Sequence, residues 1–299
     1  MAFDPGGLTV YIDGEYVDGS EARVPIWDHG LLYGDGIFEG MRLFAGSLFR
    51  PHDHLARLAT SAKAMGLELP LEGDELLDVI CEVIVRSGLE DAHVRPIVTR
   101  GFGAPGLDPA RCERASLIVA AYPFPPLLGS DPIGVIVSSV TRKAPRSVGG
   151  NVKSLNYVDA VMAKRQANAA GAGDAIMLDH LGAVAELTAA NVFAVIGGTL
   201  VTPTLRSALP GITRRTILEI AAERGIPTEV RDLWPMELYV ADAVFATGSG
   251  AGIVLIDRVD GNHVATADDQ VVAAVSDGYW ARTRDSRYLV PVRERVGAR

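Results

Sequence analysis

One stretch of this 299-residue sequence breaks every regular pattern around it. Residues 123–130 are Pro-Phe-Pro-Pro-Leu-Leu-Gly-Ser, which follow neither the alternation of a strand nor the period of a helix. Domain boundaries fall in such segments. The sequence therefore predicts two domains, residues 1–122 and residues 132–299, joined by a linker at 123–131, and the chain is long enough to bury a core in each.

Strands and helices alternate on both sides of this break. In the first half, apolar patterns and turn residues predict strands at 8–13, 37–44, 47–50, 93–100 and 115–122, and helices at 51–66 and 74–86. In the second half they predict strands at 133–140, 175–179, 183–187, 192–196, 199–201, 228–231 and 243–247, and helices at 157–169, 213–224 and 268–283. No period of 20 to 50 residues repeats. The expected fold class is α/β or α+β, with two unlike domains.

Composition excludes several classes of protein. The net charge of −9 opposes binding to a nucleic-acid backbone, and no basic run offsets it. No apolar run is long enough for a transmembrane helix and no signal peptide is recognisable, so a cytoplasmic protein is expected. The two cysteines, Cys81 and Cys112, are expected to be free thiols. His52 and His54 lack a third ligand nearby, so no metal site is predicted.

Lysine is rare in this chain. Lys63 and Lys164 lie in predicted helices and Lys143 in a basic loop, all ordinary solvated settings. Lys153 instead lies between a glycine pair and a predicted helix start, where its side chain can project into a cleft. Only a lysine amine kept away from water or near positive charge is neutral enough to attack a carbonyl. Lys153 is therefore either a structural lysine or a nucleophile.

Two segments are suited to bind an anion. Residues 209–214 lead directly into a predicted helix, whose first N–H groups and dipole attract negative charge. Residues 247–252 form a glycine-rich turn after an apolar strand, in which the backbone can approach an anion closely. Arg57 could complete a phosphate site. Each feature also has an ordinary interpretation, as an N-cap, a turn and a solvated arginine.

Glu186 ends a predicted strand among small apolar residues. A carboxylate there needs a partner that offsets the cost of its desolvation. A protonated ring nitrogen would be such a partner, and an ionised Glu186 would keep that nitrogen protonated. The alternative is a surface glutamate at a strand end.

Seven segments together carry a resemblance that covers nearly the whole chain. They are residues 33–40 (YGDGIFEG), 54–58 (HLARL), 94–101 (VRPIVTRG), 153–157 (KSLNY), Glu186 with Asn191, 209–214 (LPGITR) and 247–249 (TGS). In this order and spacing they resemble the fold-type IV enzymes that use pyridoxal 5′-phosphate (PLP), the family of branched-chain and D-amino acid aminotransferases. The resemblance implies a small α/β domain and a larger pseudo-barrel α/β domain that binds PLP.

The resemblance also implies a role for each matching residue. Lys153 would form the aldimine with PLP and shuttle the proton, Glu186 would pair with the pyridine nitrogen, and Tyr157 would donate to the 3-oxygen of the ring. The other expected cofactor-binding residues are Arg57, Asn191, Leu209, Gly211, Ile212, Thr213, Gly248 and Ser249, and the expected substrate-binding residues are Tyr33, Phe38, His93, Arg95 and Gly250. Members of the family are homodimers or higher oligomers, so a homodimer is expected.

Within the family, residues 101–109 look most like those of archaeal and bacterial branched-chain aminotransferases. The loop at 104–107 lacks the arginine and histidine with which D-amino acid aminotransferases bind the substrate carboxylate. The expected activity is transfer of an amino group from a branched-chain L-amino acid to 2-oxoglutarate.

Two departures leave other reactions open. His93 replaces a usual tyrosine, and Ser249-Gly250 replaces a usual Thr-Ala turn. The alternatives with the same cofactor are a D-amino acid or (R)-amine transaminase and a lyase of the aminodeoxychorismate type. A non-catalytic protein that binds an anionic metabolite is a further alternative.

Overall fold

The computed structural model describes residues 3–123 and 131–298. Contacts divide the chain into two compact units: the first contains Met1–Phe124, Val152–Asn156 and Asp285–Arg299, and the second contains Pro125–Asn151 and Tyr157–Arg284. The predicted linker at 123–131 lies almost entirely outside the described residues.

The first unit differs from the predicted first domain at two places. Residues 152–156 belong to it because Ser154 forms a β-bridge with Ile37, and residues 285–299 belong to it because Leu289–Pro291 pairs with Ser47–Phe49. Both are pairings between residues far apart in the sequence, so the local pattern at the break could not indicate them.

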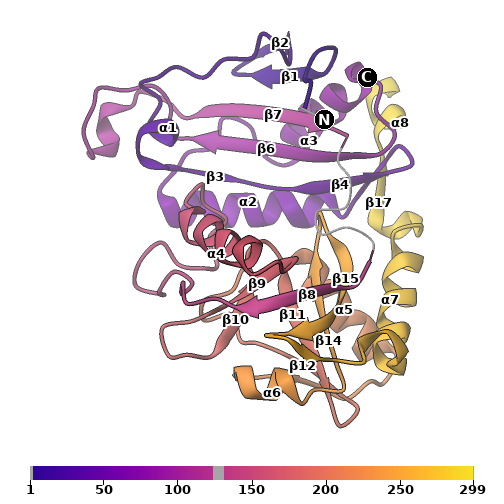
Figure 1. Cartoon of the computed structure of the whole chain (residues 1–299). Coiled ribbons are helices and arrows are strands. Elements are labelled where there is room, and N and C mark those ends of the chain that lie inside the picture. Colours follow the sequence, from indigo (N-terminus) through magenta and orange to yellow (C-terminus); the bar gives the residue numbers. More distant parts are fainter. Residues whose placement is uncertain (1–2, 124–130, 299) are drawn as a thin grey trace. The chain divides into compact units, whose positions relative to one another are not determined.

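The first unit is built on an eight-stranded sheet (Figure 1). Its path runs β17-β5-β4-β6-β7-β1-β2, with β3 paired to β6. The strands are β1 (Thr9–Ile12), β2 (Glu15–Asp18), β3 (Gly36–Phe38), β4 (Met41–Phe44), β5 (Ser47–Phe49), β6 (Ala92–Thr99), β7 (Ser116–Tyr122) and β17 (Leu289–Pro291). The single strand predicted at 37–44 is thus two strands, β3 and β4, interrupted at Glu39 and Gly40.

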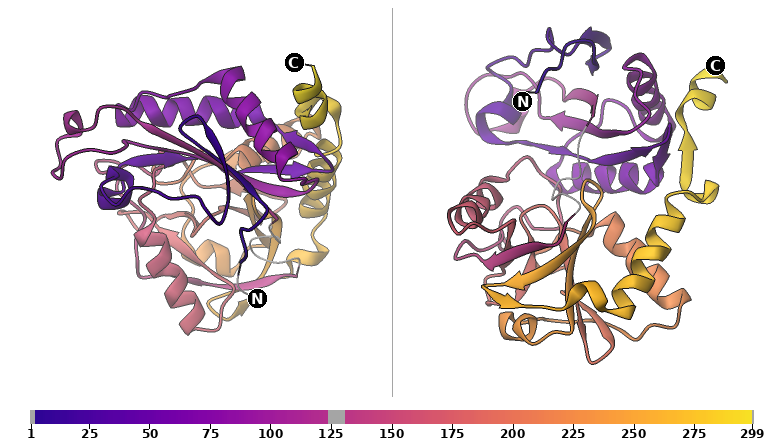
Figure 2. Two further views of the ribbon diagram at one scale, coloured as in Figure 1. Left: turned by 90° about the horizontal axis from the view of Figure 1, so that it is seen from above. Right: turned by 45° about the vertical axis from the view of Figure 1, so that its right-hand side comes forward.

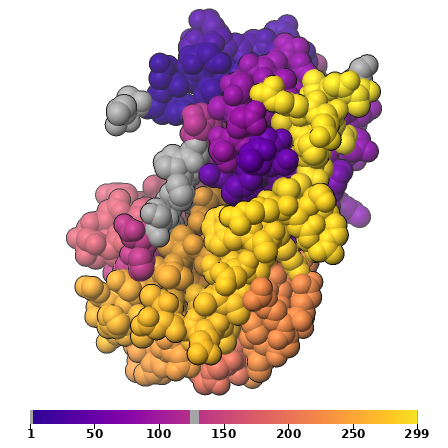
Figure 3. Space-filling view, turned by 90° about the vertical axis from the view of Figure 1, so that its right-hand side faces the viewer, coloured from indigo at the N-terminus to yellow at the C-terminus, as the bar shows by residue number. Residues whose placement is uncertain are grey.

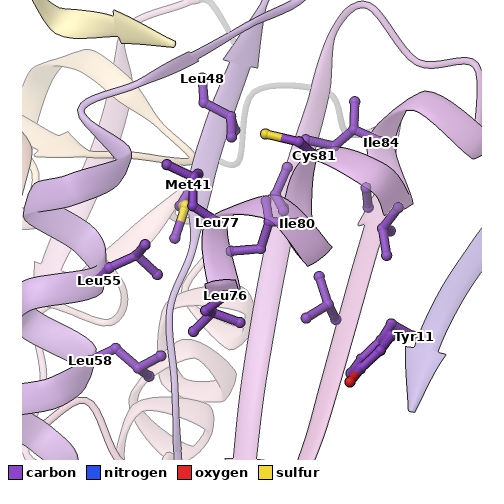
Figure 4. Close-up of a cluster of buried hydrophobic side chains, with 14 of the residues drawn as sticks. Tyr11, Met41, Leu48, Leu55, Leu58, Leu76, Leu77, Ile80, Cys81 and Ile84 are labelled. Atoms are coloured by element: carbon purple, nitrogen blue, oxygen red, sulfur yellow. The ribbon is translucent and has the colours of Figure 1, made fainter. Parts of the chain in front are cut away.

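Two amphipathic helices pack on this sheet, α2 (Pro51–Met65) and α3 (Gly73–Arg86), and Figure 2 shows them from two further sides. Leu55 and Leu58 of α2 and Ile80 of α3 are buried with strand residues such as Met41 in one hydrophobic cluster (Figure 4). The unit also contains α1 (His29–Tyr33), η1 (Pro109–Arg111), η3 (Ser286–Tyr288) and α8 (Val292–Gly297). The cluster holds α2 and β3 together, and both carry predicted site residues.

The second unit contains a nine-stranded mixed sheet. Its path runs β10-β9-β8-β15-β14-β11-β12-β13, with β16 paired to β15. The strands are β8 (Ile133–Val137), β9 (Asp174–Leu178), β10 (Val184–Leu187), β11 (Asn191–Ile196), β12 (Thr199–Thr202), β13 (Thr228–Val230), β14 (Ala243–Gly248), β15 (Gly252–Val259) and β16 (Asn262–His263). Both units thus mix helices and strands, which confirms the predicted fold class.

The helices of the second unit are α4 (Val158–Ala169), α5 (Ile212–Glu223), α6 (Pro235–Tyr239) and α7 (Gln270–Arg282), together with η2 (Thr266–Asp268). Arg282 of α7 forms ion pairs with Glu219 and Glu223 of α5, which hold these two helices together. One side of α7 remains exposed (yellow in Figure 3). Among the residues that the structure describes, no helix is long and apolar enough to cross a membrane.

Candidate active site

Lys153 lies on a segment that pairs with β3 through a β-bridge between Ser154 and Ile37. The amide of Phe38 donates to the carbonyl of Lys153 over 3.0 Å, and the amide of Leu155 donates to Gly36 over 2.9 Å. The amide of Lys153 donates to the Ser61 hydroxyl of α2 over 3.3 Å. These bonds on both sides fix the backbone of Lys153, so its side chain has a defined starting point, as a nucleophile requires.

The side chain of Lys153 lies over an aromatic ring. Its Nζ is 4.5 Å from the centroid of Phe38, and Cζ of Arg95 is 4.9 Å from the same centroid. The buried Nε of Arg95 has no hydrogen-bond partner in the part of the chain that the structure describes. The ring thus presents apolar surface beside an amine, and Arg95 is a cationic group that a carboxylate could bind.

Arg57 is held by a buried carboxylate that we had not assigned to the site. Glu39 accepts from Nε of Arg57 over 2.6 Å and from Nη2 over 2.8 Å, and His54 Nδ1 lies 2.8 Å from Glu39. Burial opposes the charge of Glu39, but Arg57 and His54 hold the pKa of this carboxyl well below its ordinary value. Burial also opposes the charge of His54, and it therefore lowers the pKa of this imidazole. Arg57 is therefore an oriented cation and not the freely solvated arginine of the ordinary interpretation.

His93 lies on β6, two residues before Arg95, and is buried. Burial, followed by the charges of Arg95 and Lys153, lowers the pKa of His93 to about 3. The imidazole is therefore neutral at neutral pH. A Cβ on Gly40 would lie 2.9 Å from Nε2 of His93, so the ring packs directly against the backbone there.

Tyr33, the last residue of α1, is the most exposed of the predicted substrate-binding residues of this unit. Its hydroxyl accepts from the amide of Gly106 over 2.8 Å, and its ring contacts His29 edge to face. Tyr33 is thereby tied to the loop after β6.

In the second unit, Glu186 forms the centre of a buried polar cluster. Its Oε1 accepts from Nη2 of Arg142 over 2.5 Å, and its Oε2 accepts from the Asn191 amide group over 3.2 Å and from the Leu209 backbone amide over 3.1 Å. Arg142 also pairs with Asp159 over 3.1 Å. Burial lowers the pKa of Arg142, but the carboxylates of Glu186 and Asp159 outweigh burial and raise it.

This cluster corrects two sequence-based interpretations. Arg142 belongs to the basic loop around Lys143 that the sequence predicts to be solvated, yet the residue is 4% exposed. Glu186 was expected to depend on a ligand for its partner, but Arg142 already compensates its charge. Nearby, Lys143 lies 5.0 Å above the ring of Tyr157, the N-cap residue of α4.

Asn191 connects Glu186 to the start of α5. Its amide group also donates to the carbonyl of Leu209 over 2.9 Å. A Cβ on Gly211 would lie 2.0 Å from Asn191 Oδ1, so only glycine allows this approach. The residues that precede α5 are thereby held against β11.

The start of α5 offers donors to an anion. Gly211 is its N-cap and no side chain caps the helix. The amides of Ile212 and Thr213 belong to the first turn, where N–H groups lack intrahelical partners and the dipole favours negative charge. Ile212 and Thr213 are both buried.

The predicted glycine-rich turn lies between β14 and β15. Gly248 pairs with Gly252 in the register, and the amide of Ala251 donates to Gly248 over 3.1 Å. Gly248, Ser249 and Gly250 are all partly exposed. A reversal of the chain at this point leaves these residues accessible to a ligand.

Within each unit, the structure therefore groups the predicted residues. The first unit carries Tyr33, Phe38, Arg57, His93, Arg95 and Lys153, and the second carries Tyr157, Glu186, Asn191, Leu209, Gly211, Ile212, Thr213, Gly248, Ser249 and Gly250. In the described part of the chain, no group of three or more His, Cys, Asp or Glu side chains is placed to hold a metal ion.

The comparisons with known proteins identify the class. The model of the class IV aminotransferase family matches residues 36–259. The chain belongs to this family, and class IV aminotransferases are PLP-dependent enzymes.

One named relative and two solved structures are similar to this chain over most of its length. A Methanocaldococcus jannaschii protein, provisionally named a branched-chain-amino-acid aminotransferase, is 44% identical over 85% of this chain and 88% of its own length. The solved Thermoproteus uzoniensis branched-chain aminotransferase with norvaline has a TM-score of 0.91 at 33% identity and covers 96% of this chain and 100% of its own. The solved Escherichia coli branched-chain amino acid aminotransferase has a TM-score of 0.91 at 32% identity and covers 95% of this chain and 99% of its own.

Proposed function

We propose that this aminotransferase transfers the amino group of a branched-chain L-amino acid to 2-oxoglutarate. The observation that carries the proposal is the placement of Lys153 Nζ and Arg95 over the buried ring of Phe38. An apolar substrate side chain would pack on such a ring, and a carboxylate would pair with the arginine. The names of the relatives support the same substrate class.

The residues fit PLP. Lys153 would hold the cofactor covalently as a Schiff base, because its backbone is fixed and its amine lies on an apolar surface. Arg57 and the amides of Ile212 and Thr213, together with Ser249, would bind the phosphate. Gly211 and Gly248 would let the backbone approach it, Leu209 would pack under the ring, and Asn191 would hold Leu209 and Glu186 in place.

The bound cofactor supplies an electron sink for the charge that develops at the substrate's α-carbon. Lys153 Nζ would have two tasks: it would take up the α-proton of the substrate and later give a proton back. Glu186 would pair with the protonated pyridine nitrogen, and the contact with Arg142 holds the Glu186 carboxylate in place. Tyr157 would donate to the 3-oxygen of the ring.

The substrate pocket would include Tyr33, Phe38, His93, Arg95 and Gly250. Because His93 is neutral, it would donate or accept one hydrogen bond and add no charge to the pocket.

The test is the absorption spectrum of the PLP-bound protein after addition of L-leucine, D-alanine or (R)-1-phenylethylamine. Conversion to the pyridoxamine band by L-leucine alone is the expected result. Conversion by D-alanine or by the amine, without conversion by L-leucine, would contradict the branched-chain assignment.

One observation favours a second candidate, a D-amino acid or (R)-amine transaminase. His93 packs against Gly40 where a tyrosine is usual, and the turn at Ser249 and Gly250 also departs from the usual residues. The same spectra decide between the two candidates. A lyase would be recognised by release of pyruvate from its substrate without any keto-acid acceptor.

We also propose a homodimer. Four side chains of the first unit, Ile26, Leu31, Phe102 and Leu107, are each more than half exposed. Their two segments are neighbours, because the amide of His29 donates to Gly101, residue 102 forms a β-bridge with residue 28, and the amide of Gly106 donates to the Tyr33 hydroxyl. An exposed apolar patch of this kind marks an interface. Size-exclusion chromatography with light scattering would test the proposed homodimer, and a monomer would contradict it.

A cytoplasmic location stays a sequence-based prediction.

A further inference from the structure

A buried hydroxyl of the second unit has no partner. Thr247, the penultimate residue of β14, is 0% exposed, and its Oγ1 forms no hydrogen bond among the described residues. Burial of an unsatisfied hydroxyl is unfavourable, and such groups are few in native proteins. A valine of the same shape would avoid the cost. A buried hydroxyl at this position is therefore favourable only if a bound group accepts its hydrogen bond.

The pairing of β14 with β11 shows to which face of the sheet Thr247 points. Thr247 is directly opposite Asn191 in the antiparallel pair of β14 and β11. Directly opposite residues point to the same face of a sheet, with their Cβ atoms about 5 Å apart. Asn191 faces the start of α5, because it contacts Gly211 and bonds to Leu209. The Thr247 hydroxyl therefore faces the same side.

This face is otherwise apolar along the two strands. Two residues further along the strands, Phe193 lies opposite Phe245, and their rings stack with centroids 5.1 Å apart. The hydroxyl thus lies on the face that carries this aromatic pair and from which Asn191 reaches the N-terminus of α5. A group that accepts hydrogen bonds and is bound at the amides of that N-terminus would also be the natural acceptor for the hydroxyl.

We propose that Thr247 is a further cofactor-binding residue, whose Oγ1 donates a hydrogen bond to the phosphate of PLP. This inference rests on the proposed phosphate site at Ile212 and Thr213. It adds a donor from inside the sheet, just before the turn that carries Ser249.

The test compares three variants of the apoenzyme. Thr247→Val and Thr247→Ala remove the hydroxyl, whereas Thr247→Ser keeps it. Hydrogen bonds to charged groups have a larger effect than neutral ones, so we expect PLP to bind about 10-fold more weakly to Thr247→Val and Thr247→Ala. Thr247→Ser should bind PLP within about twofold of the wild type. Urea unfolding of the apoenzyme should show Thr247→Val to be at least as stable as the wild type.

Pyridoxal, which lacks the phosphate, is the matched ligand. Its affinity should be the same for the wild type and for Thr247→Val. The inference is overturned if Thr247→Val binds PLP as tightly as the wild type, or if pyridoxal loses as much affinity as PLP. Failure of the proposed function is a separate outcome, since it appears in the wild type as absent conversion of PLP by L-leucine.

Discussion

The ion pair between Arg142 and Glu186 provides the strongest test of the energetics of the site. The side chains are 3% and 6% exposed and meet at 2.5 Å. Arg142→Met keeps most of the buried volume but removes the cation, which leaves Glu186 with the neutral donors of Asn191 and Leu209. Removing one partner of a buried pair costs about 3 kcal/mol or more, because the remaining charge stays buried without compensation.

We expect the free energy of unfolding of the apoenzyme at pH 7 to fall by about 3 kcal/mol in Arg142→Met, measured by urea unfolding with circular dichroism. Arg146→Met is the matched control, since Arg146 is an exposed arginine four residues later. That control should change stability by less than about 0.5 kcal/mol.

The double variant Arg142→Met/Glu186→Gln isolates the pair. It removes both charges, so its loss of stability should be smaller than the sum of the two single losses by at least about 1 kcal/mol. A loss below about 1 kcal/mol in Arg142→Met, similar to that of Arg146→Met, would refute the reasoning. Additive losses in the double variant would refute it as well.

Three further predictions concern His93, Gly211 and Lys153. Burial lowers the folded-state pKa of His93 from 6.5 to about 3, so between these pH values the unfolded state binds more protons and the free energy of unfolding falls as the pH falls. His93→Phe should reduce the slope of the free energy of unfolding against pH by up to about 1.4 kcal/mol per pH unit. Urea unfolding in the acid range measures this slope, and an unchanged slope in the variant would contradict the prediction. Gly211→Ala should lower the free energy of unfolding by about 1–3 kcal/mol, because the new Cβ would displace Asn191, whereas Gly248→Ala, with no contact nearer than 3.5 Å, should lower it less; equal losses would contradict the packing argument. Lys153→Ala should abolish transamination while PLP still binds through its phosphate, and normal turnover would contradict the assignment of the nucleophile.

Local sequence signals predicted the regular elements well. Helix α2 begins at Pro51 and ends before Gly66, whose φ of 59° is the left-handed conformation that favours glycine. The strands predicted at 175–179 and 183–187 likewise correspond to β9 and β10. In contrast, α1 and α6 each have 5 residues, too few to show a helical period. Strand β15 was missed although its hairpin with β14 is local, with Gly248 opposite Gly252; only its second pairing, with β8, joins distant parts of the chain.

The chemistry of the site was only partly visible in the sequence. Lys153 stood out because lysine is rare and its setting differs from that of the other lysines. Arg142 could not be recognised, because its burial depends on Glu186, 44 residues away. Glu39 lies in a segment that carried the resemblance, but its partners Arg57 and His54 come from α2. Charge compensation of this kind is a property of the folded chain.

The most direct test of the central claim is to locate the covalently bound cofactor. The chain contains four lysines, Lys63, Lys143, Lys153 and Lys164, so borohydride reduction of the PLP-bound protein followed by peptide mass spectrometry gives an unambiguous position. We predict a single phosphopyridoxyl group on the peptide that contains Lys153. A group on another lysine would contradict the assignment of the nucleophile, and the absence of any adduct would contradict the account of this chain as a PLP-dependent aminotransferase.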